Sequence, residues 1–277
     1  LQNQRNKSME CKLICSDIDG TLLDVNRQLS KQTIAAVQRV KSEIPFLLIS
    51  SRMPKSMRLL QSELGTLEAP LIAYNGALVM GAERKIIQST EIPYSITQAI
   101  CNCIPEFKLH FSLYHQDEWV VPAMDFWAKR EMNNTRVSPK VCPLVDILAL
   151  WKQDQKGAHK IMAMGDSDQL DCVEQFISEN CSNKVNAYRS KETYLEISNS
   201  QLDKASALSK LLSEEYPNFS MDEVMAFGDN YNDQTMLERV GRGVAVANAK
   251  PEILSSIQTH TLSSHDHGVA FTIEQYC

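Results

Sequence analysis

The 277-residue sequence lacks any apolar run close to 18 residues, which is about the length that a membrane-spanning helix needs. It also lacks a secretion signal, because residues 1–12 (LQNQRNKSMECK) are polar and contain no apolar stretch. We expect residues 1–8 to be a disordered extension, with Met9 as a candidate natural start. The sequence therefore predicts a cytoplasmic protein that does not interact with membranes.

An excess of basic residues is also missing, since the formal net charge is -6. This argues against a nucleic-acid surface, which normally needs a basic patch. The eight cysteines include no CxxC pair, so a zinc site is not indicated. Without a signal peptide, free thiols in a reducing compartment are expected, and a redox role for Cys101 and Cys103 is the minor alternative.

Short apolar runs alternate with amphipathic segments near both ends of the sequence, which is typical of βαβ units and a parallel sheet. Helices are expected to begin near residues 30, 54, 204 and 251. We predict core strands at residues 13–15, 46–49, 71–74, 194–197, 224–227 and 241–246, and the chain closes with an apolar run at residues 269–273. The fold class is therefore α/β.

The middle of the sequence breaks this rhythm. A hairpin is predicted from runs 77–80 and 86–92, and a mixture of strands and helices follows it. We therefore predict a discontinuous core domain, residues 1–82 and 190–277, with an inserted α+β domain at residues 83–189.

Polar side chains follow the predicted core strands. They are Asp17 and Asp19 after the first strand, Ser50 and Asn75 after the next two, and then Asp229, Asn232 and Asp233. Carboxyl ends of parallel strands lie at one edge of a sheet, so these residues should converge. Converging carboxylates repel each other unless a cation is present, and hard oxygen ligands suit magnesium. An ordinary turn after the first strand would need only one Asp and one Gly.

Lys204 opens a predicted helix and would supply a cation at this acidic edge. Taken alone, Lys204 would be a surface lysine and Ser50 a turn or cap residue; beside a metal, both become candidates for contact with phosphate. Two carboxylates in different environments can have different roles. One can act as the nucleophile while the other transfers a proton. Attack on phosphorus would give an aspartyl phosphate.

At these residues the sequence resembles the haloacid dehalogenase superfamily of phosphatases, in its Cof-type branch with a C2B α/β cap. The family motif DxDGTL is matched by residues 17–22, (T/S)GR by 50–52, NGA by 75–77 and GDxxND by 228–233, and the family lysine by Lys204. The resemblance covers nearly the whole chain and implies a Rossmann-like core with a cap that closes over the site.

The sequence departs from the family pattern at four positions. Ser51, Ala205 and Ala247 stand where glycine is usual, and His267 stands where the branch commonly has aspartate. None of these removes a catalytic group, so the departures concern loop geometry and substrate choice.

The resemblance implies a role for each matched residue. Asp17 would be the nucleophile, and Asp19 the general acid and then the general base. Ser50 and Lys204 would bind the transferring phosphoryl group, with Asn232 helping to hold Lys204 or the phosphate. Magnesium would be held by Asp17, the Asp19 carbonyl, Asp229 and, through water, Asp233.

The inserted domain should set specificity for a small phosphorylated metabolite, such as a sugar phosphate or a phosphorylated cofactor. Candidates for contact with the leaving group are polar or aromatic: Asn75, Tyr114, His115, Trp119, Trp127, Arg130 and Arg189. His115 and His159 are not expected to bind a metal, because neither has a partner at ligand spacing.

Three alternatives stay open. A phosphomutase or phosphotransferase with the same first motif would pass the phosphoryl group to a second substrate instead of water. A phospho-accepting receiver module also combines aspartates, a hydroxyl residue and a lysine, but it is usually about half this length. A non-catalytic protein of the same fold would normally have lost its nucleophile, whereas Asp17 is intact.

Overall fold

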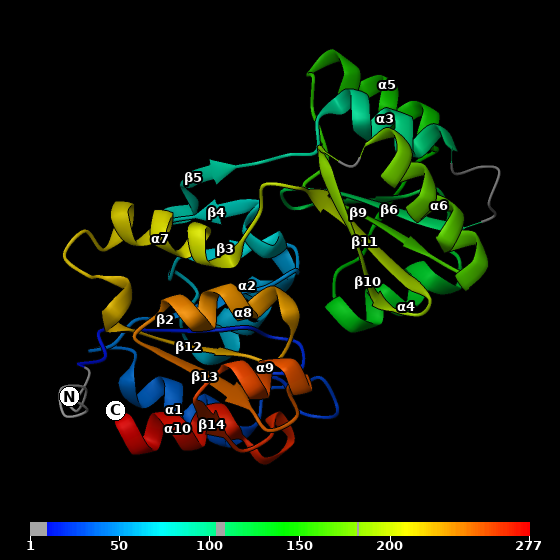
Figure 1. The fold of residues 1–277 in the computed structure, drawn as a ribbon. Helices are drawn as coiled ribbons and strands as arrows, with labels where there is room; N and C mark the ends of the chain where they lie inside the picture. The colour runs from blue at the N-terminus through cyan, green and yellow to red at the C-terminus, as the bar shows by residue number, and fades with distance from the viewer. Residues whose placement is uncertain (1–9, 104–108, 182) are drawn as a thin grey trace. The chain divides into compact units, whose positions relative to one another are not determined.

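A computed structural model describes residues 10–103, 109–181 and 183–277 (Figure 1). The predicted extension at residues 1–8 lies outside these residues. The chain divides into two compact units: unit 1 is Leu1–Ser51, Met57–Ile87 and Asp203–Cys277, and unit 2 is Arg52–Ser56 and Gln88–Leu202. Among the residues described, no helix combines the length and the apolar character needed to cross a membrane.

Unit 1 is built on an eight-stranded sheet with the strand order β14-β13-β12-β1-β2-β3-β4-β5 (Figure 1). The strands are β1 (Leu13–Ser16), β2 (Phe46–Ile49), β3 (Leu71–Ala73), β4 (Leu78–Met80), β5 (Ile86–Ser89), β12 (Val224–Gly228), β13 (Arg242–Val246) and β14 (Thr259–Thr261). β1 lies between β12 and β2 and is parallel to both, so the carboxyl ends of these three strands share one edge.

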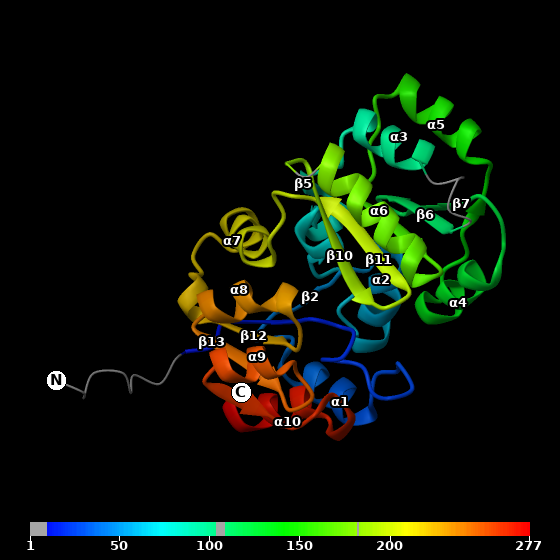
Figure 2. The same cartoon turned by 45° about the vertical axis from the view of Figure 1, so that its right-hand side comes forward.

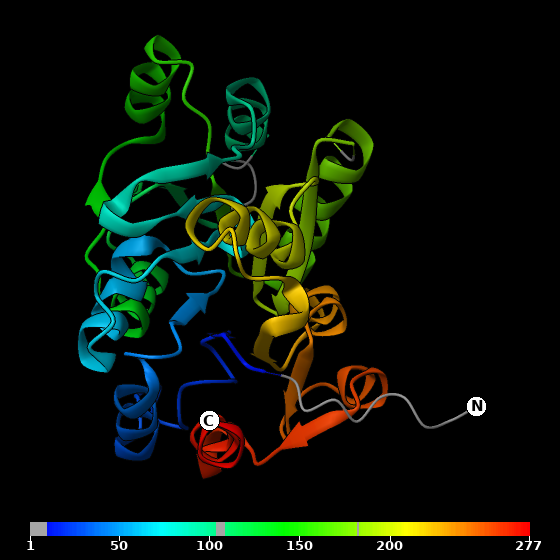
Figure 3. The same ribbon diagram turned by 90° about the vertical axis from the view of Figure 1, so that its left-hand side faces the viewer.

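Helices cover both faces of the unit 1 sheet, so every residue of β1 is buried. They are α1 (Lys31–Val40), α2 (Pro54–Leu64), α7 (Lys204–Glu215), α8 (Tyr231–Arg239), α9 (Pro251–Ser256) and α10 (Gly268–Tyr276). Leu13 and Cys15 of β1 pack in a cluster with Leu208, Met236 and Ile253 from α7, α8 and α9. α1 and α10 lie side by side (Figure 2), and Figure 3 shows α10 in red on the opposite side of β1 from the yellow α7.

The structure shows the conformation of the apolar run at residues 269–273. Residues 269–273 belong to helix α10, where the Phe271 N–H donates to His267 O at 3.0 Å. The buried residues Val269, Ala270 and Ile273 have helical spacing, which a run of five apolar or small residues does not distinguish from a strand. One edge strand of the sheet is β14, which was not predicted.

Unit 2 is built on a six-stranded sheet with the order β10-β11-β9-β6-β7-β8. Its strands are β6 (His110–His115), β7 (Glu118–Val121), β8 (Lys140–Val141), β9 (Lys160–Met164), β10 (Val185–Lys191) and β11 (Tyr194–Asn199). Its helices are α3 (Tyr94–Cys103), α4 (Phe126–Thr135), α5 (Leu144–Gln153) and α6 (Ser167–Asn180). α3, α5 and α6 bury one face of the sheet in a single apolar cluster that includes Phe111, Leu113 and Trp151.

The structure also moves the predicted domain boundaries. Residues 194–197, predicted as a core strand, belong to β11, which is antiparallel to β9 and β10 in unit 2. The predicted boundary between residues 189 and 190 therefore cuts through the β10–β11 hairpin. An apolar run indicates a strand, but it does not indicate which sheet the strand joins.

Candidate active site

The end of β1 places Asp17 at the carboxyl edge of the unit 1 sheet. Its N–H donates to Phe227 O at 3.0 Å, which continues the pairing of β1 with β12. The Asp17 side chain is buried, and Lys204 Nζ donates to its Oδ1 at 2.6 Å. The buried carboxylate is therefore paired with a cation, as burial of charge requires.

Lys204 bridges two buried acids. Its side chain is only 1% exposed, and its Nζ also donates to Asp233 Oδ1 at 2.5 Å. The lysine is held there because it is the first residue of α7, whose N-cap Asp203 accepts the N–H of Ala205 at 2.9 Å. Burial would lower the pKa of Lys204, but Asp17 and Asp233 together raise it, so the ammonium stays charged.

Asp233 fixes the turn that follows β12. Its Oδ2 accepts the N–H groups of Asp229 and Asn230, both at 3.0 Å, in a capping box at the start of α8. A Cβ on Gly228 would lie 2.5 Å from the Asp233 Cβ, so only glycine leaves room for this side chain. The turn thereby carries Asp229 to the same edge as Asp17.

Three carboxylates meet at this edge. Asp17, Asp229 and Asp233 each offer one oxygen, and these atoms all lie within 4.8 Å of one another. Burial raises the pKa of Asp17 well above its usual range, although Lys204 opposes this. Burial and then Asp233 raise the pKa of Asp229 to about 6, although Thr21 Oγ1, which donates to Asp229 Oδ1 at 2.7 Å, lowers it. The one positive charge of Lys204 does not balance the charges of three carboxylates. Their oxygen atoms therefore suit a hard divalent cation as ligands.

Asp19 and Gly20 form the turn after Asp17. The Asp19 side chain is 35% exposed, and Arg27 pairs with its Oδ1 at 2.6 Å. Gly20 has a φ of +89°, and its carbonyl accepts a hydrogen bond from Asn248 Nδ2 at 2.7 Å. Asp19 is thus accessible to solvent where Asp17 is not, and the two acids occupy different environments.

Ser50, Asn75 and Asn232 lie at neighbouring strand ends. Ser50 is buried after β2, and its carbonyl accepts the Asn75 N–H at 2.9 Å. Asn232 Nδ2 donates to Asn75 Oδ1 at 3.0 Å, which links the start of α8 to the turn after β3. The hydrogen-bond partner of Asn232 is therefore Asn75, a pairing that the sequence did not suggest.

Sequence reasoning missed Thr21 and Asn248 as site residues. Thr21 holds Asp229, and Asn248 holds the Gly20 carbonyl. A signal was present for both: Thr21 follows the pair of aspartates, and Asn248 lies two residues beyond the end of β13, so the strand-end argument covers it as well.

The unit 2 candidates separate onto two faces of its sheet. Tyr114 and Trp119 are buried and stacked, with ring centroids 5.8 Å apart, on the face away from Phe111 and Leu113. Trp127, which lies on α4, packs edge-on against Tyr194, with ring centroids 5.6 Å apart.

Arg130 lies over the Tyr194 ring at 5.4 Å. Arg189 is instead paired with Asp171 and Glu174 of α6. The Arg189 guanidinium is therefore already paired with two acids of α6. This pairing does not support a role for Arg189 in contacting a leaving group.

The structure brings His115 and His159 together with Glu91, with their ligand atoms within 4.8 Å. The two rings are hydrogen-bonded inside unit 2: His115 Nδ1 lies 2.9 Å from Gly157 O, and His159 Nε2 lies 2.9 Å from Ser89 Oγ. Burial lowers the pKa of His159 to about 3, so its ring is neutral. These hydrogen bonds give both buried rings polar partners within unit 2, so a structural role explains both histidines.

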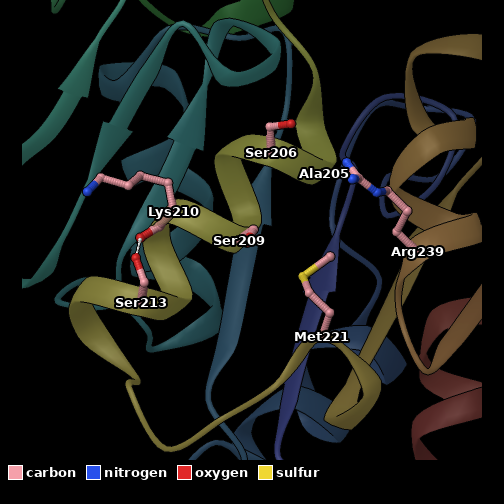
Figure 4. A pocket seen from close by; sticks show the side chains of 7 residues that line it. All are labelled: Ala205, Ser206, Ser209, Lys210, Ser213, Met221 and Arg239. Carbon is pink, nitrogen blue, oxygen red and sulfur yellow. Dashed lines mark hydrogen bonds between the residues drawn. The ribbon is translucent and has the colours of Figure 1, made fainter.

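Unit 1 also has a cavity of about 440 Å³ beside α7, distinct from the acidic edge (Figure 4). Its lining includes Ser206, Ser209, Lys210, Met221 and Arg239. Lys210 pairs with Glu214 and points away from Arg239 in Figure 4. The two cations do not converge, so the cavity lacks the features of a catalytic site.

Comparison with known proteins identifies the family. The family model for haloacid dehalogenase-like hydrolases matches residues 14–273 of this chain. A Haemophilus influenzae protein named "Putative phosphatase" is 29% identical over 268 residues, covering 96% of this chain and 98% of that protein. The 5-amino-6-(5-phospho-D-ribitylamino)uracil phosphatase YitU of Bacillus subtilis is 25% identical, with 97% and 99% coverage.

A solved structure is also similar. The crystal structure of a haloacid dehalogenase-like hydrolase from Bacteroides thetaiotaomicron superimposes with a TM-score of 0.88 at 26% identity, covering 96% of this chain and all of that one. The chain therefore belongs to the haloacid dehalogenase-like hydrolases and is a phosphatase of their Cof-type branch.

Proposed function

We propose that the protein is a magnesium-dependent phosphomonoester hydrolase that acts on small phosphorylated metabolites through an aspartyl phosphate on Asp17. The observation that carries this proposal is the buried Asp17–Lys204–Asp233 arrangement beside Asp229. Asp17, the Asp19 carbonyl, Asp229 and, through water, Asp233 would hold magnesium. Once bound, the ion would neutralise charge on the carboxylate and phosphate oxygens.

Asp17 is the group suited to attack. Lys204 keeps a positive charge 2.6 Å from Asp17 Oδ1 and favours the ionised carboxylate in spite of its burial. A carboxylate oxygen of Asp17 bonds to phosphorus while the bond from phosphorus to the leaving oxygen breaks. Lys204, Ser50 and Asn232 are the proposed partners of the phosphoryl oxygens during this step.

Asp19 is the group suited to move protons. It is partly exposed, and Arg27 pairs with one of its oxygens. In the first step Asp19 gives a proton to the leaving oxygen. In the second it takes a proton from water, whose oxygen attacks phosphorus and releases phosphate from Asp17.

The substrate class is supported by a relative that is named as the phosphatase of a phosphoribitylamino uracil, a small phosphorylated metabolite. A cytoplasmic location is supported by seven described cysteines that are free thiols.

The reaction is tested by release of inorganic phosphate from an aryl phosphate. We expect magnesium-dependent release that chelation with EDTA abolishes and that needs no added acceptor. Release that depends on a sugar acceptor would favour the mutase alternative, and no release from any of a panel of phosphorylated metabolites would contradict the proposal.

Magnesium binding should weaken below pH 6. Because the pKa of Asp229 is raised to about 6 and that of Asp17 is also raised, protons compete with the metal at low pH. For Asp229, whose ordinary value is 3.8, the metal-free folded state binds a proton between about pH 4 and 6 that the unfolded state has lost. Metal-free stability should therefore fall as pH rises through this window, and the rise in Tm caused by magnesium should be larger at pH 7.5 than at pH 5. An equal rise at both pH values would contradict this prediction.

Gly20→Ala should weaken magnesium binding at least about tenfold. A Cβ at residue 20 would lie 2.5 Å from Asp229 Oδ2, at a φ of +89°. Gly65→Ala is the matched control, because its φ is +72° but its Cβ meets only the flexible end of Lys41. Both variants should lose about 1 kcal/mol of stability from backbone strain. Titration of Tm against magnesium should separate them, and equal magnesium affinities would refute the role given to Gly20.

A further inference from the structure

An ion pair joins Asp19 to the loop between β1 and α1. Arg27 Nη2 donates to Asp19 Oδ1 at 2.6 Å. Both side chains are partly exposed, Arg27 at 41% and Asp19 at 35%. An ion pair that is this exposed contributes little to the stability of a fold. Stability alone therefore does not explain why Arg27 is held beside Asp19.

The turn that carries Arg27 is held by its own hydrogen bonds. Asp24 Oδ1 accepts the N–H groups of Asn26 at 2.8 Å and of Gln28 at 2.9 Å. The Asp24 carbonyl accepts the Arg27 N–H at 2.9 Å, and the buried Leu29 follows the turn. The backbone of Arg27 therefore has a defined position, although the side chains around it are exposed.

The backbone of Arg27 is left-handed, with a φ of +59°. This conformation is uncommon for a residue with a long side chain, and it costs energy that a glycine would avoid. Such backbone strain is found at sites where the direction of a side chain matters. The left-handed turn and the 2.6 Å contact therefore point to one role for Arg27, which is to hold the Asp19 carboxyl group.

The contact also distinguishes the two oxygens of Asp19. A guanidinium donates hydrogen bonds and accepts none. Because Oδ1 accepts from Arg27, a proton on Oδ1 would compete with the guanidinium, and the proton of the acid form belongs on Oδ2. Arg27 thereby restricts the rotation of the carboxyl group and selects the oxygen that carries the proton.

We propose that Arg27 is a positioning residue, which orients Asp19 so that its Oδ2 gives the proton to the leaving oxygen. The proposal rests on the proposed function, in which Asp19 is the general acid. During the transfer the Oδ2–H bond breaks and the proton bonds to the leaving oxygen. The negative charge that remains on Asp19 is paired with Arg27. Arg27 acts through Asp19 and needs no contact with the substrate.

The test compares two aryl phosphates at saturating magnesium. Dinitrophenolate leaves without a proton, whereas phenolate needs one, so phenyl phosphate is the ester that depends on the general acid. We expect Arg27→Gln to lower kcat/KM at least about tenfold for phenyl phosphate and less than about twofold for dinitrophenyl phosphate. Equal losses with the two esters, or no loss with either, would overturn the proposal.

Two further variants serve as controls. Arg27→Lys keeps the positive charge and should retain more activity with phenyl phosphate than Arg27→Gln does. Arg39→Gln, which changes an exposed arginine of α1, should match the parent protein with both esters. The Tm of Arg27→Gln should lie within about 2 °C of the parent, because the ion pair is exposed.

A double variant separates action through Asp19 from direct contact with the substrate. Phenol release is followed in a single turnover with excess protein, which detects slow reactions. In an Asp19→Asn background, Arg27→Gln should change the rate less than about twofold, because the group that it positions is gone. An equal loss in both backgrounds would show that Arg27 contacts the substrate and would overturn the proposal.

The Asp19→Asn protein also distinguishes the failure of this proposal from the failure of the proposed function. Asp19→Asn keeps the backbone carbonyl and should lose far more activity with phenyl phosphate than with dinitrophenyl phosphate. Equal losses with the two esters would remove Asp19 as the general acid, and the role of Arg27 with it. If Asp19→Asn shows the expected difference and Arg27→Gln does not, the role of Arg27 alone is refuted.

Discussion

Asp17→Asn is expected to lower kcat for aryl phosphate hydrolysis by at least about 10⁴-fold, because the amide cannot attack phosphorus. The fold should survive, since Lys204 keeps its 2.5 Å contact with Asp233 and the buried site loses one of its mutually repelling acids. The measurement is kcat with saturating magnesium, together with Tm for each protein. Because Asp17 also belongs to the acidic cluster, magnesium affinity is measured in the same series.

Asp222→Asn is the matched control, since Asp222 is an exposed aspartate in the turn before β12. It should keep parental kcat and Tm. Retention of substantial activity by a folded Asp17→Asn protein would remove Asp17 as the nucleophile, whatever its magnesium affinity.

Lys204→Met should lower kcat at least about 10³-fold and destabilise unit 1 by about 3 kcal/mol. Both effects have one cause: the ammonium is the shared partner of two buried carboxylates, Asp17 at 2.6 Å and Asp233 at 2.5 Å. Without it, folding must bury both acids unpaired or protonate one of them. Stability is measured by urea unfolding, and activity is measured at a temperature where the variant is folded.

A second substitution separates the two roles of the lysine. Adding Asp233→Asn to Lys204→Met removes one of the orphaned charges, so part of the stability should return while the activity stays lost. Lys210→Met, on the same helix but exposed and paired with Glu214, should change neither property. Recovery of activity in the double variant would show that Lys204 acts only through folding.

The sequence was sufficient for the acidic site because one physical rule covers it: parallel strands end at one edge. That rule brings Asp17 and Asp229 together. Their roles are implied by the resemblance alone and stay predictions. The rule could not predict the hydrogen bonds of Asp233. One of its oxygens accepts N–H groups of the turn and the other accepts from Lys204, and this depends on the exact path of the turn.

The inserted unit was harder to predict, for a definite reason. Most of its strands pair antiparallel, and α3, α5 and α6 bury one face of the sheet. Short apolar runs therefore indicate the strands but not the partners with which they pair. The run at residues 194–197 was therefore assigned to the wrong sheet. The charge of Arg189 could not reveal that two acids of α6 already engage it.

The most direct test of the account is to trap the covalent intermediate. The protein is mixed with substrate and magnesium, quenched in acid within one turnover, and reduced with borohydride, which converts an acyl phosphate to an alcohol. The account predicts that Asp17 alone becomes homoserine, and that protein treated without substrate is unmodified. Reduction at another carboxylate, or turnover with no reducible intermediate at any quench time, would contradict the account.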